Sequence, residues 1–182
     1  IGSAIRQDGR SASLTAPNGR AQQKVLVASI SDAQHQPSGV SVVEAHGTGT
    51  ALGDPIEAGA VAAVFLSQRD RSDDPLIVGS LKANAGHTEP GAGLAGALKL
   101  LVQLRHSEMA TNAQLRALNP HVGASLRGHT TCALPTQSAA LTLGSSDGGV
   151  SSFGYSGTIA HLVLRCSIGK RYSISPRPPS YV

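Results

Sequence analysis

The sequence contains no tryptophan and few aromatic residues of any kind, with two Phe and three Tyr among 182 residues. Surfaces that stack nucleic-acid bases place aromatic rings beside basic side chains, and this composition offers little material for one. There is no Gly-X-Y repeat, which excludes a collagen-like chain, and the 40% hydrophobic content is too high for a disordered one. With 21 Gly and so few rings, the interior is expected to pack through close approach of backbones.

Cysteine and long apolar runs are also scarce. Cys132 and Cys166 are too few for a disulfide framework, so a reducing, cytoplasmic location is expected. No apolar run approaches the roughly 18 residues of a membrane span. Seven His occur without an H-x-x-x-H pair or a C-x-x-C, so we expect no metal site. The sequence starts at Ile1 without a leader, and we expect it to be part of a longer protein whose targeting signals are not in it.

The formal net charge of +4 comes entirely from the end of the sequence. Residues 1–164 carry eleven basic and eleven acidic side chains, whereas residues 165–182 carry four basic and no acidic ones. A balanced body with no basic stripe gives no reason to expect a nucleic-acid partner. We therefore predict one folded part over 1–164 and a basic, proline-rich, disordered tail over 165–182.

Hydrophobic patterning predicts an α/β chain in which strand-loop-helix units alternate. The predicted strands are 40–45, 76–81, a weak one at 140–143, and two within 148–165 that are joined by a glycine turn. The predicted helices begin near Pro17 and end near Ile30, begin at Asp54, and cover about 91–106. Residues 1–20 are polar and turn-rich, and residues 109–136 are expected to be irregular.

The helix that begins at Asp54 follows the glycine-rich loop GTGTALG. Asp54, Pro55 and Glu57 occupy the N-cap, N1 and N3 positions of a capping box, so we expect both carboxylates to serve helix initiation.

The helix over 91–106 is apolar nearly all round, since leucines and small residues occupy both of its faces. Such a helix is expected to be buried on both sides, with a layer of structure above and below it.

A histidine follows each of the first two predicted strands: His46 after VSVVEA and His87 after LIVGSLKANAG. In layered α/β folds, sites form outside the carboxyl ends of the strands, so the two loops are expected to converge. Two neutral imidazoles that donate N–H groups to one oxygen would stabilise an enolate or a tetrahedral oxyanion. Lys82 could orient a ring or supply positive charge nearby. The simpler alternative is that each histidine only ends a loop.

Three long motifs occur in order: VEAHGTGTALGDPIEAGA, GSLKANAGHTEPGAGLAGALKLLVQLRH and GVSSFGYSGTIAHLVL. They resemble the signature blocks of the second half of β-ketoacyl synthases, above all the ketosynthase domains of modular polyketide synthases. The resemblance runs from Ile1 to about Leu164. It implies the C-terminal half of a thiolase-like, layered α-β-α-β-α sandwich.

The resemblance also implies an activity, the decarboxylative Claisen condensation of an acyl thioester with a malonyl-type extender in polyketide or fatty-acid synthesis. The phosphopantetheine would arrive on an acyl carrier protein, and no cofactor would be bound directly. Other implied partners are the N-terminal half of the domain and, in the complete enzyme, a second copy in a homodimer. The residues carried over by motif are the catalytic His46, His87 and Lys82, the pantetheine-binding Thr48 and Thr50, and Phe153 and Tyr155 of the oxyanion and acyl-pocket turn.

The sequence departs from the family pattern at several points. The family's nucleophilic cysteine belongs to the first half, upstream of Ile1, and neither Cys132 nor Cys166 has the setting of an activated thiol. Arg6 stands where the family usually has Asn, and Ile159 replaces the Asn of GTNAH. A dinucleotide site and a serine hydrolase are disfavoured because the glycine spacings do not fit. Two alternatives stay open: a catalytically incomplete remnant that binds carrier protein or a complementary half, and a decarboxylase-like relative.

Overall fold

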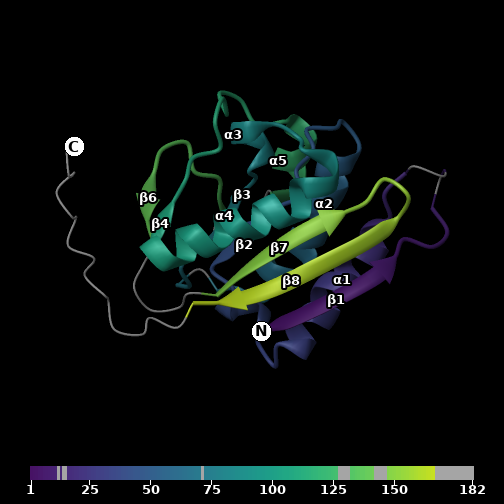
Figure 1. Cartoon of the computed structure of the whole chain (residues 1–182), viewed down its shortest axis with the longest axis horizontal. Helices are drawn as coiled ribbons and strands as arrows, with labels where there is room; N and C mark the ends of the chain where they lie inside the picture. Colours follow the sequence, from purple (N-terminus) through teal and green to yellow (C-terminus); the bar gives the residue numbers. More distant parts are fainter. Residues whose placement is uncertain (12, 14–15, 71, 127–131, 142–146, 167–182) are drawn as a thin grey trace, which may run out of the picture.

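The structure, a computed structural model, describes the whole chain except residues 12, 14–15, 71, 127–131, 142–146 and 167–182. A six-stranded sheet has the order β1-β8-β7-β2-β3-β5 (Figure 1). Its strands are β1 (Gly2–Gln7), β2 (Val42–Glu44), β3 (Leu76–Gly79), β5 (Cys132–Ala133), β7 (Asp147–Phe153) and β8 (Thr158–Arg165). A small second sheet pairs β4 (Glu108–Met109) with β6 (Ala139–Ala140).

The sheet is mixed. The strands β7, β2, β3 and β5 run parallel, while β8 is antiparallel to both β7 and β1. The helices are α1 (Gly19–Asp32), α2 (Gly53–Val61), α3 (Lys82–Ala85), α4 (Ala92–His106) and α5 (Pro120–Leu126). Short turns are η1 (Pro37–Gly39), the π-helical η2 (Ala62–Leu66) and η3 (Glu89–Gly91).

Helices cover both faces of the sheet, with α4 across β2 and β7 on one face and α1 and α2 on the other (Figure 1). Alternation along β2 shows the two sides: Val42 packs with Leu100 of α4, and Val43 packs with Leu26 of α1. The α/β layers predicted from the sequence are therefore present in the described part of the chain.

Glycines allow the close packing that the composition predicts. A Cβ on Gly148 of β7 would lie 2.7 Å from Leu100, and a Cβ on Gly149 would lie 2.5 Å from the His161 ring. Neither position leaves space for a side chain, so α4 packs against bare backbone at Gly148 and the His161 ring of β8 does so at Gly149.

Three sequence expectations for the regular elements need correction. Residues 2–7 form β1 on the sheet edge, because pairing with β8 stabilises a segment whose composition is polar. The region 109–136 contains α5 and β5. Pro17 lies just before α1, whose N-cap is Asn18; its side chain accepts hydrogen bonds from the N–H groups of Arg20 and Ala21.

The expectation of a helix buried on both sides is met on one side only within the described part of the chain. Leu100 and Leu104 of α4 are fully buried against the sheet, whereas Leu94 is 69% and Val102 57% exposed. Leu98 and Leu101 belong to the same exposed side. The predicted tail lies outside the described residues from 167 onward. No described helix combines the length and apolar character needed to cross a membrane.

Candidate functional site

The site is built where parallel strands end at one edge of the sheet. His46 follows β2, the α3 segment that leads to His87 follows β3, and Phe153 is the last residue of β7. These three strands are neighbours with the same direction, so their carboxyl ends meet at one edge. This topology brings the two histidine loops together, as the strand-end argument predicts.

The rings of His46 and His87 are perpendicular, with centroids 5.8 Å apart. Phe153 lies on the other side of His46, with ring centroids 5.6 Å apart. Burial, with smaller contributions from the charges of Lys82 and His87, lowers the pKa of His46 to about 4, so the imidazole is neutral at pH 7. The Nδ1 of His87 accepts the Glu89 N–H at 3.1 Å, which leaves the ring proton on Nε2.

Glu57 holds the backbone of the first histidine loop. Its two carboxylate oxygens accept the N–H groups of His46 at 2.7 Å and Gly47 at 2.9 Å. The capping-box prediction is therefore wrong: α2 begins at Gly53 with Leu52 as the N-cap and no side-chain cap. Glu57 binds the histidine loop in place of its own helix N-terminus, because the turn at Gly47, with φ of 47°, presents the N–H groups of His46 and Gly47 to its carboxylate.

The rest of the GTGTALG loop is closed by short hydrogen bonds. Asp54 accepts the Gly49 N–H at 3.1 Å, so this carboxylate also serves the loop. The Thr50 hydroxyl accepts the Gly53 N–H at 3.0 Å and lies 3.4 Å from the Thr48 hydroxyl. Thr50 is exposed and Thr48 is half-buried, so both hydroxyls border open space.

Lys82 is the first residue of α3 and is half-buried. Desolvation lowers its pKa, and the negative charges of Glu57, Glu44 and Asp54 oppose that shift. Within the described part of the chain it makes no ion pair at contact distance. Its ammonium therefore acts on the site as positive charge at a distance, and it contributes to lowering the pKa of His46.

The turn between β7 and β8 carries Tyr155, which is 82% exposed. The turn is closed by the Gly154 N–H, which donates to the Thr158 carbonyl at 2.7 Å, and by the side chain of Gln7, which donates to the Ser156 carbonyl at 3.1 Å. Ile159, in place of the family's Asn, is 1% exposed and packs into the core beside α1. The turn is thus braced by backbone and Gln7 contacts without a side-chain amide at position 159.

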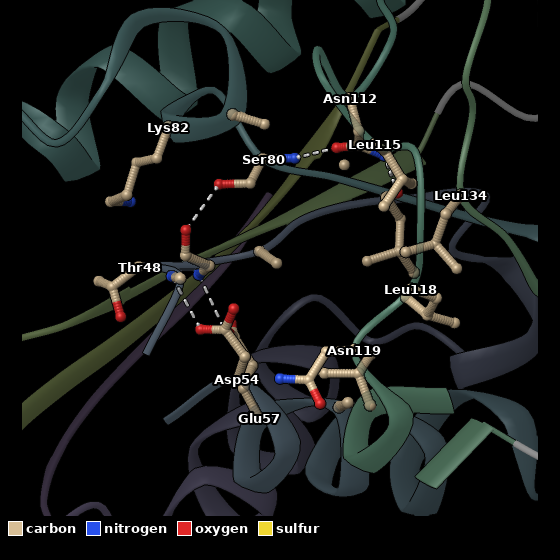
Figure 2. Close-up of a pocket in the computed structure, with 18 of the residues that line it drawn as sticks. Thr48, Asp54, Glu57, Ser80, Lys82, Asn112, Leu115, Leu118, Asn119 and Leu134 are labelled. Carbon is tan, nitrogen blue, oxygen red and sulfur yellow. Dashed lines mark hydrogen bonds between the residues drawn. The ribbon is translucent and has the colours of Figure 1, made fainter. Parts of the chain in front are cut away.

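Two cavities flank the first histidine loop. One, of about 520 Å³, is lined by His46, His87, Thr48, Thr50, Phe153 and Tyr155, which are six of the seven predicted site residues. The seventh, Lys82, lines a second cavity of about 570 Å³ whose far wall is apolar. Figure 2 shows this second cavity, with Lys82 at one end and Leu115, Leu118 and Leu134 at the other. Thr48 and Glu57 border both cavities.

Sequence reasoning missed several residues that hold this framework. Glu44, on β2, accepts the Leu81 N–H and pairs with Lys99. Asn112 accepts the Ser80 N–H at 3.0 Å and donates to the Val78 carbonyl at 3.1 Å (Figure 2). A glutamate within an apolar strand was the available signal, since a buried carboxylate requires partners. Asn112 lies in a segment without periodicity and had no such signal.

The chain has clear relatives among known proteins. Residues 1–116 match the C-terminal domain of the β-ketoacyl synthases. The chain belongs to the β-ketoacyl synthase family. It is 47% identical over 165 residues to a phenolphthiocerol/phthiocerol polyketide synthase of Mycobacterium tuberculosis, covering 90% of this chain and 9% of the relative. It is 44% identical to an erythronolide synthase of Saccharopolyspora erythraea over 165 residues, covering 90% of this chain and 5% of the relative.

Solved ketosynthase structures have the same fold. An oxazolomycin ketosynthase domain from Streptomyces albus superposes with a TM-score of 0.84 at 32% identity, covering 93% of this chain and 29% of that chain. The ketosynthase from module 6 of the bacillaene synthase of Bacillus subtilis gives 0.83 at 35% identity, covering 94% and 32%. The chain thus corresponds to about a third of a solved ketosynthase chain and to the C-terminal part of a polyketide synthase ketosynthase.

Proposed function

We propose that this chain supplies the extender-activating part of a ketosynthase that performs decarboxylative Claisen condensation. The observation that carries the proposal is the His46 and His87 pair, with perpendicular rings 5.8 Å apart beside one cavity. Each ring has an N–H to donate: burial keeps His46 neutral, and the Glu89 N–H occupies Nδ1 of His87, which leaves Nε2 of that ring as the donor. Two such donors aimed at one thioester oxygen stabilise the negative charge that forms on it.

The proposed reaction begins with decarboxylation of the extender. The bond between the carboxylate carbon and the α-carbon of a malonyl-type thioester breaks, carbon dioxide leaves, and the electron pair becomes an enolate whose oxygen accepts N–H bonds from the histidines. The α-carbon then attacks the carbonyl of an acyl group held as a thioester on a cysteine of another segment, and that thiolate leaves. The ammonium of Lys82 makes the local potential more positive, which favours the enolate.

The roles of the remaining predicted residues are inferred from their positions in the cavity that His46 and His87 line. Thr48 and Thr50 place two hydroxyls on the wall where a phosphopantetheine arm on a carrier protein would enter. Phe153 packs against His46 and closes that side of the cavity. The turn around Tyr155 would offer backbone N–H groups to the acyl carbonyl oxygen.

The test uses a complete ketosynthase, meaning a polypeptide in which this chain follows a segment with an acyl-accepting cysteine. Carbon dioxide release from malonyl carrier protein and acyl transfer to the enzyme are measured separately. We expect both, followed by formation of a β-ketoacyl product. Carrier-protein binding without carbon dioxide release would instead support the alternative of a catalytically incomplete binding remnant.

A further inference from the structure

Glu44 is a buried carboxylate beside the site to which the proposed chemistry assigns no role. It is the last residue of β2, two positions before His46, and is 3% exposed. Its Oε2 accepts a hydrogen bond from the ammonium of Lys99, on α4, at 2.6 Å. Its Oε1 accepts a hydrogen bond from the backbone N–H of Leu81. The Lys99 side chain is itself only 9% exposed. One carboxylate therefore joins β2, α4 and the segment that carries Lys82 and His87.

The surrounding backbone is shaped to admit this pair. A Cβ on Gly96 of α4 would lie 3.2 Å from Cγ of Glu44, so α4 passes directly against the carboxylate. A Cβ on Gly79, at the end of β3, would lie 3.4 Å from Nζ of Lys99. The ammonium thus lies beside the last residue of the strand from which the Lys82 segment departs.

Leu81 is the N-cap residue of α3, so its N–H has no partner within that helix. Its carbonyl accepts the N–H groups of Asn84 and Ala85, which makes Leu81 the fixed start of the short helix. Anchoring the Leu81 N–H consequently sets where α3 begins, and with it where Lys82 and His87 lie relative to His46.

A contribution to stability is a weak explanation for the presence of the buried Glu44–Lys99 ion pair. Replacing a buried ion pair by apolar side chains of similar volume is often neutral or stabilising, because both charges must be desolvated. The contacts of Glu44 suggest a better explanation. A shorter or apolar residue at position 44 would leave the Leu81 N–H without its acceptor, close to Lys82 and His87.

We propose that the Glu44–Lys99 pair is a positioning device, in which Lys99 orients Glu44 and the carboxylate fixes the Leu81 N–H and thereby the Lys82 and His87 segment. The inference rests on the proposed function, because the reaction it serves is the extender decarboxylation. Neither Glu44 nor Lys99 lines either of the two cavities beside the first histidine loop, so both are positioning residues.

The experiment compares two double variants in the complete ketosynthase. Glu44→Leu with Lys99→Met removes the charges and the acceptor together, whereas Glu44→Gln with Lys99→Met removes the charges but keeps an oxygen for the Leu81 N–H. A misplacement of about 1 Å costs on the order of 100-fold in rate. We expect the first variant to lose about that factor in kcat for decarboxylation, with little change in acylation or KM, and the second to recover most of it.

Amide hydrogen exchange at Leu81 measures independently whether the Leu81 N–H is hydrogen-bonded in each variant. Protection should be lost in the Leu/Met variant and kept in the Gln/Met variant, while core amides such as that of Val163 stay protected in both. The matched control is Asp147→Asn with Arg165→Met, which removes the Asp147–Arg165 ion pair and changes the contact of the same Asp147 side chain with His35 at the opposite end of β7. It should change neither the decarboxylation rate nor the exchange at Leu81.

Two results would overturn the positioning role. The first is a Leu/Met variant that keeps both decarboxylation and Leu81 protection, and the second is a Gln/Met variant that loses as much as the Leu/Met variant. A parent enzyme that releases no carbon dioxide would instead count against the proposed function, and Leu81 exchange would still decide whether Glu44 anchors the segment.

Discussion

The carboxylate of Glu57 accepts the backbone N–H of His46 at 2.7 Å, so a residue of α2 fixes the loop that carries the first histidine. Burial raises the pKa of Glu57 to about 7, against the opposing effect of the N–H groups of Gly47 and His46. The folded chain therefore binds this proton more tightly than the unfolded chain, whose carboxyl titrates near 4.5. The contribution of Glu57 to stability accordingly falls as the pH rises from about 4.5 to 7.

The first prediction is that Glu57→Gln removes the decrease in stability between about pH 4.5 and 7, because glutamine does not titrate. Relative to the parent chain, the variant should gain a few kcal/mol between pH 4.5 and 8. Denaturant unfolding at several pH values measures the difference. If the free energies of unfolding of the parent and the variant change with pH in parallel, Glu57 does not change its protonation in this range.

The second prediction concerns His161, whose contribution to stability changes with pH in the opposite direction to that of Glu57. It is 2% exposed in β8, and its Nδ1 lies 3.0 Å from the Ser151 hydroxyl. Burial lowers its pKa to about 3, so the unfolded chain binds protons more readily below pH 6.5, and stability falls as the pH drops from there. His161→Gln keeps a hydrogen-bonding group for Ser151 but does not titrate. It should lessen acid destabilisation by up to about 1.4 kcal/mol per pH unit below 6.5. An acid unfolding midpoint unchanged from the parent would contradict this.

The third prediction is that Cys132 does not accept an acyl group. Cys132 packs on β5 against the core, and burial raises the pKa of its thiol to about 11 although Arg69 opposes the shift. At neutral pH almost no thiolate is present, and the thiolate is the nucleophile. Incubation of the chain with an acyl thioester followed by intact mass measurement should show no adduct on Cys132. Urea-unfolded chain treated with iodoacetamide is the control, because there the thiol should react.

The sequence was informative wherever periodicity or strand order determines structure. The apolar runs around Val42 and Ile77 predict two strands, and the position of one histidine after each predicts that His46 and His87 converge. The structure shows that the two strands are neighbours and that the two rings are close. This part succeeded because parallel strands of one sheet place their carboxyl ends at the same edge, whatever the details of the loops.

The sequence was uninformative where a contact from far along the chain decides the local structure. Residues 2–7 have no strand pattern of their own, and only the pairing with β8, more than 150 residues later, makes them a strand. Glu57 has the spacing of a capping residue, and only the position of the Gly47 turn shows that it binds that turn. The sequence pattern thus predicts that a helix begins close to Asp54, and α2 does begin at Gly53, but the pattern assigns the wrong N-cap residue and the wrong partner to the Glu57 side chain.

The fourth prediction concerns the exposed side of α4. Leu94 and Leu98 are 69% and 54% exposed, and a contiguous apolar surface in water favours association. The chain by itself should therefore be only marginally stable and form larger species in light scattering, and Leu94→Gln with Leu98→Gln should reduce their size. Val27→Gln is the matched control, since Val27 is 54% exposed on α1, away from this surface. A cooperative, monomeric melt of the parent chain would contradict the prediction.

The last prediction concerns the two histidines in the complete ketosynthase. A donor aimed at a developing oxyanion is worth about 10²- to 10³-fold in rate, or about 3 to 4 kcal/mol. His46→Ala and His87→Ala should each reduce carbon dioxide release from malonyl carrier protein by that factor, because each removes one N–H from the enolate oxygen. Acylation of the cysteine should change much less, since its oxyanion would be stabilised by backbone N–H groups.

Lys82→Ala should weaken the same step by removing positive charge near both rings, whereas Asp54→Ala should act on the loop by releasing the Gly49 N–H. The two rates are measured side by side for every variant. Histidine variants that lost acylation but kept decarboxylation would place the pair at the acyl carbonyl, and the enolate assignment would then be wrong.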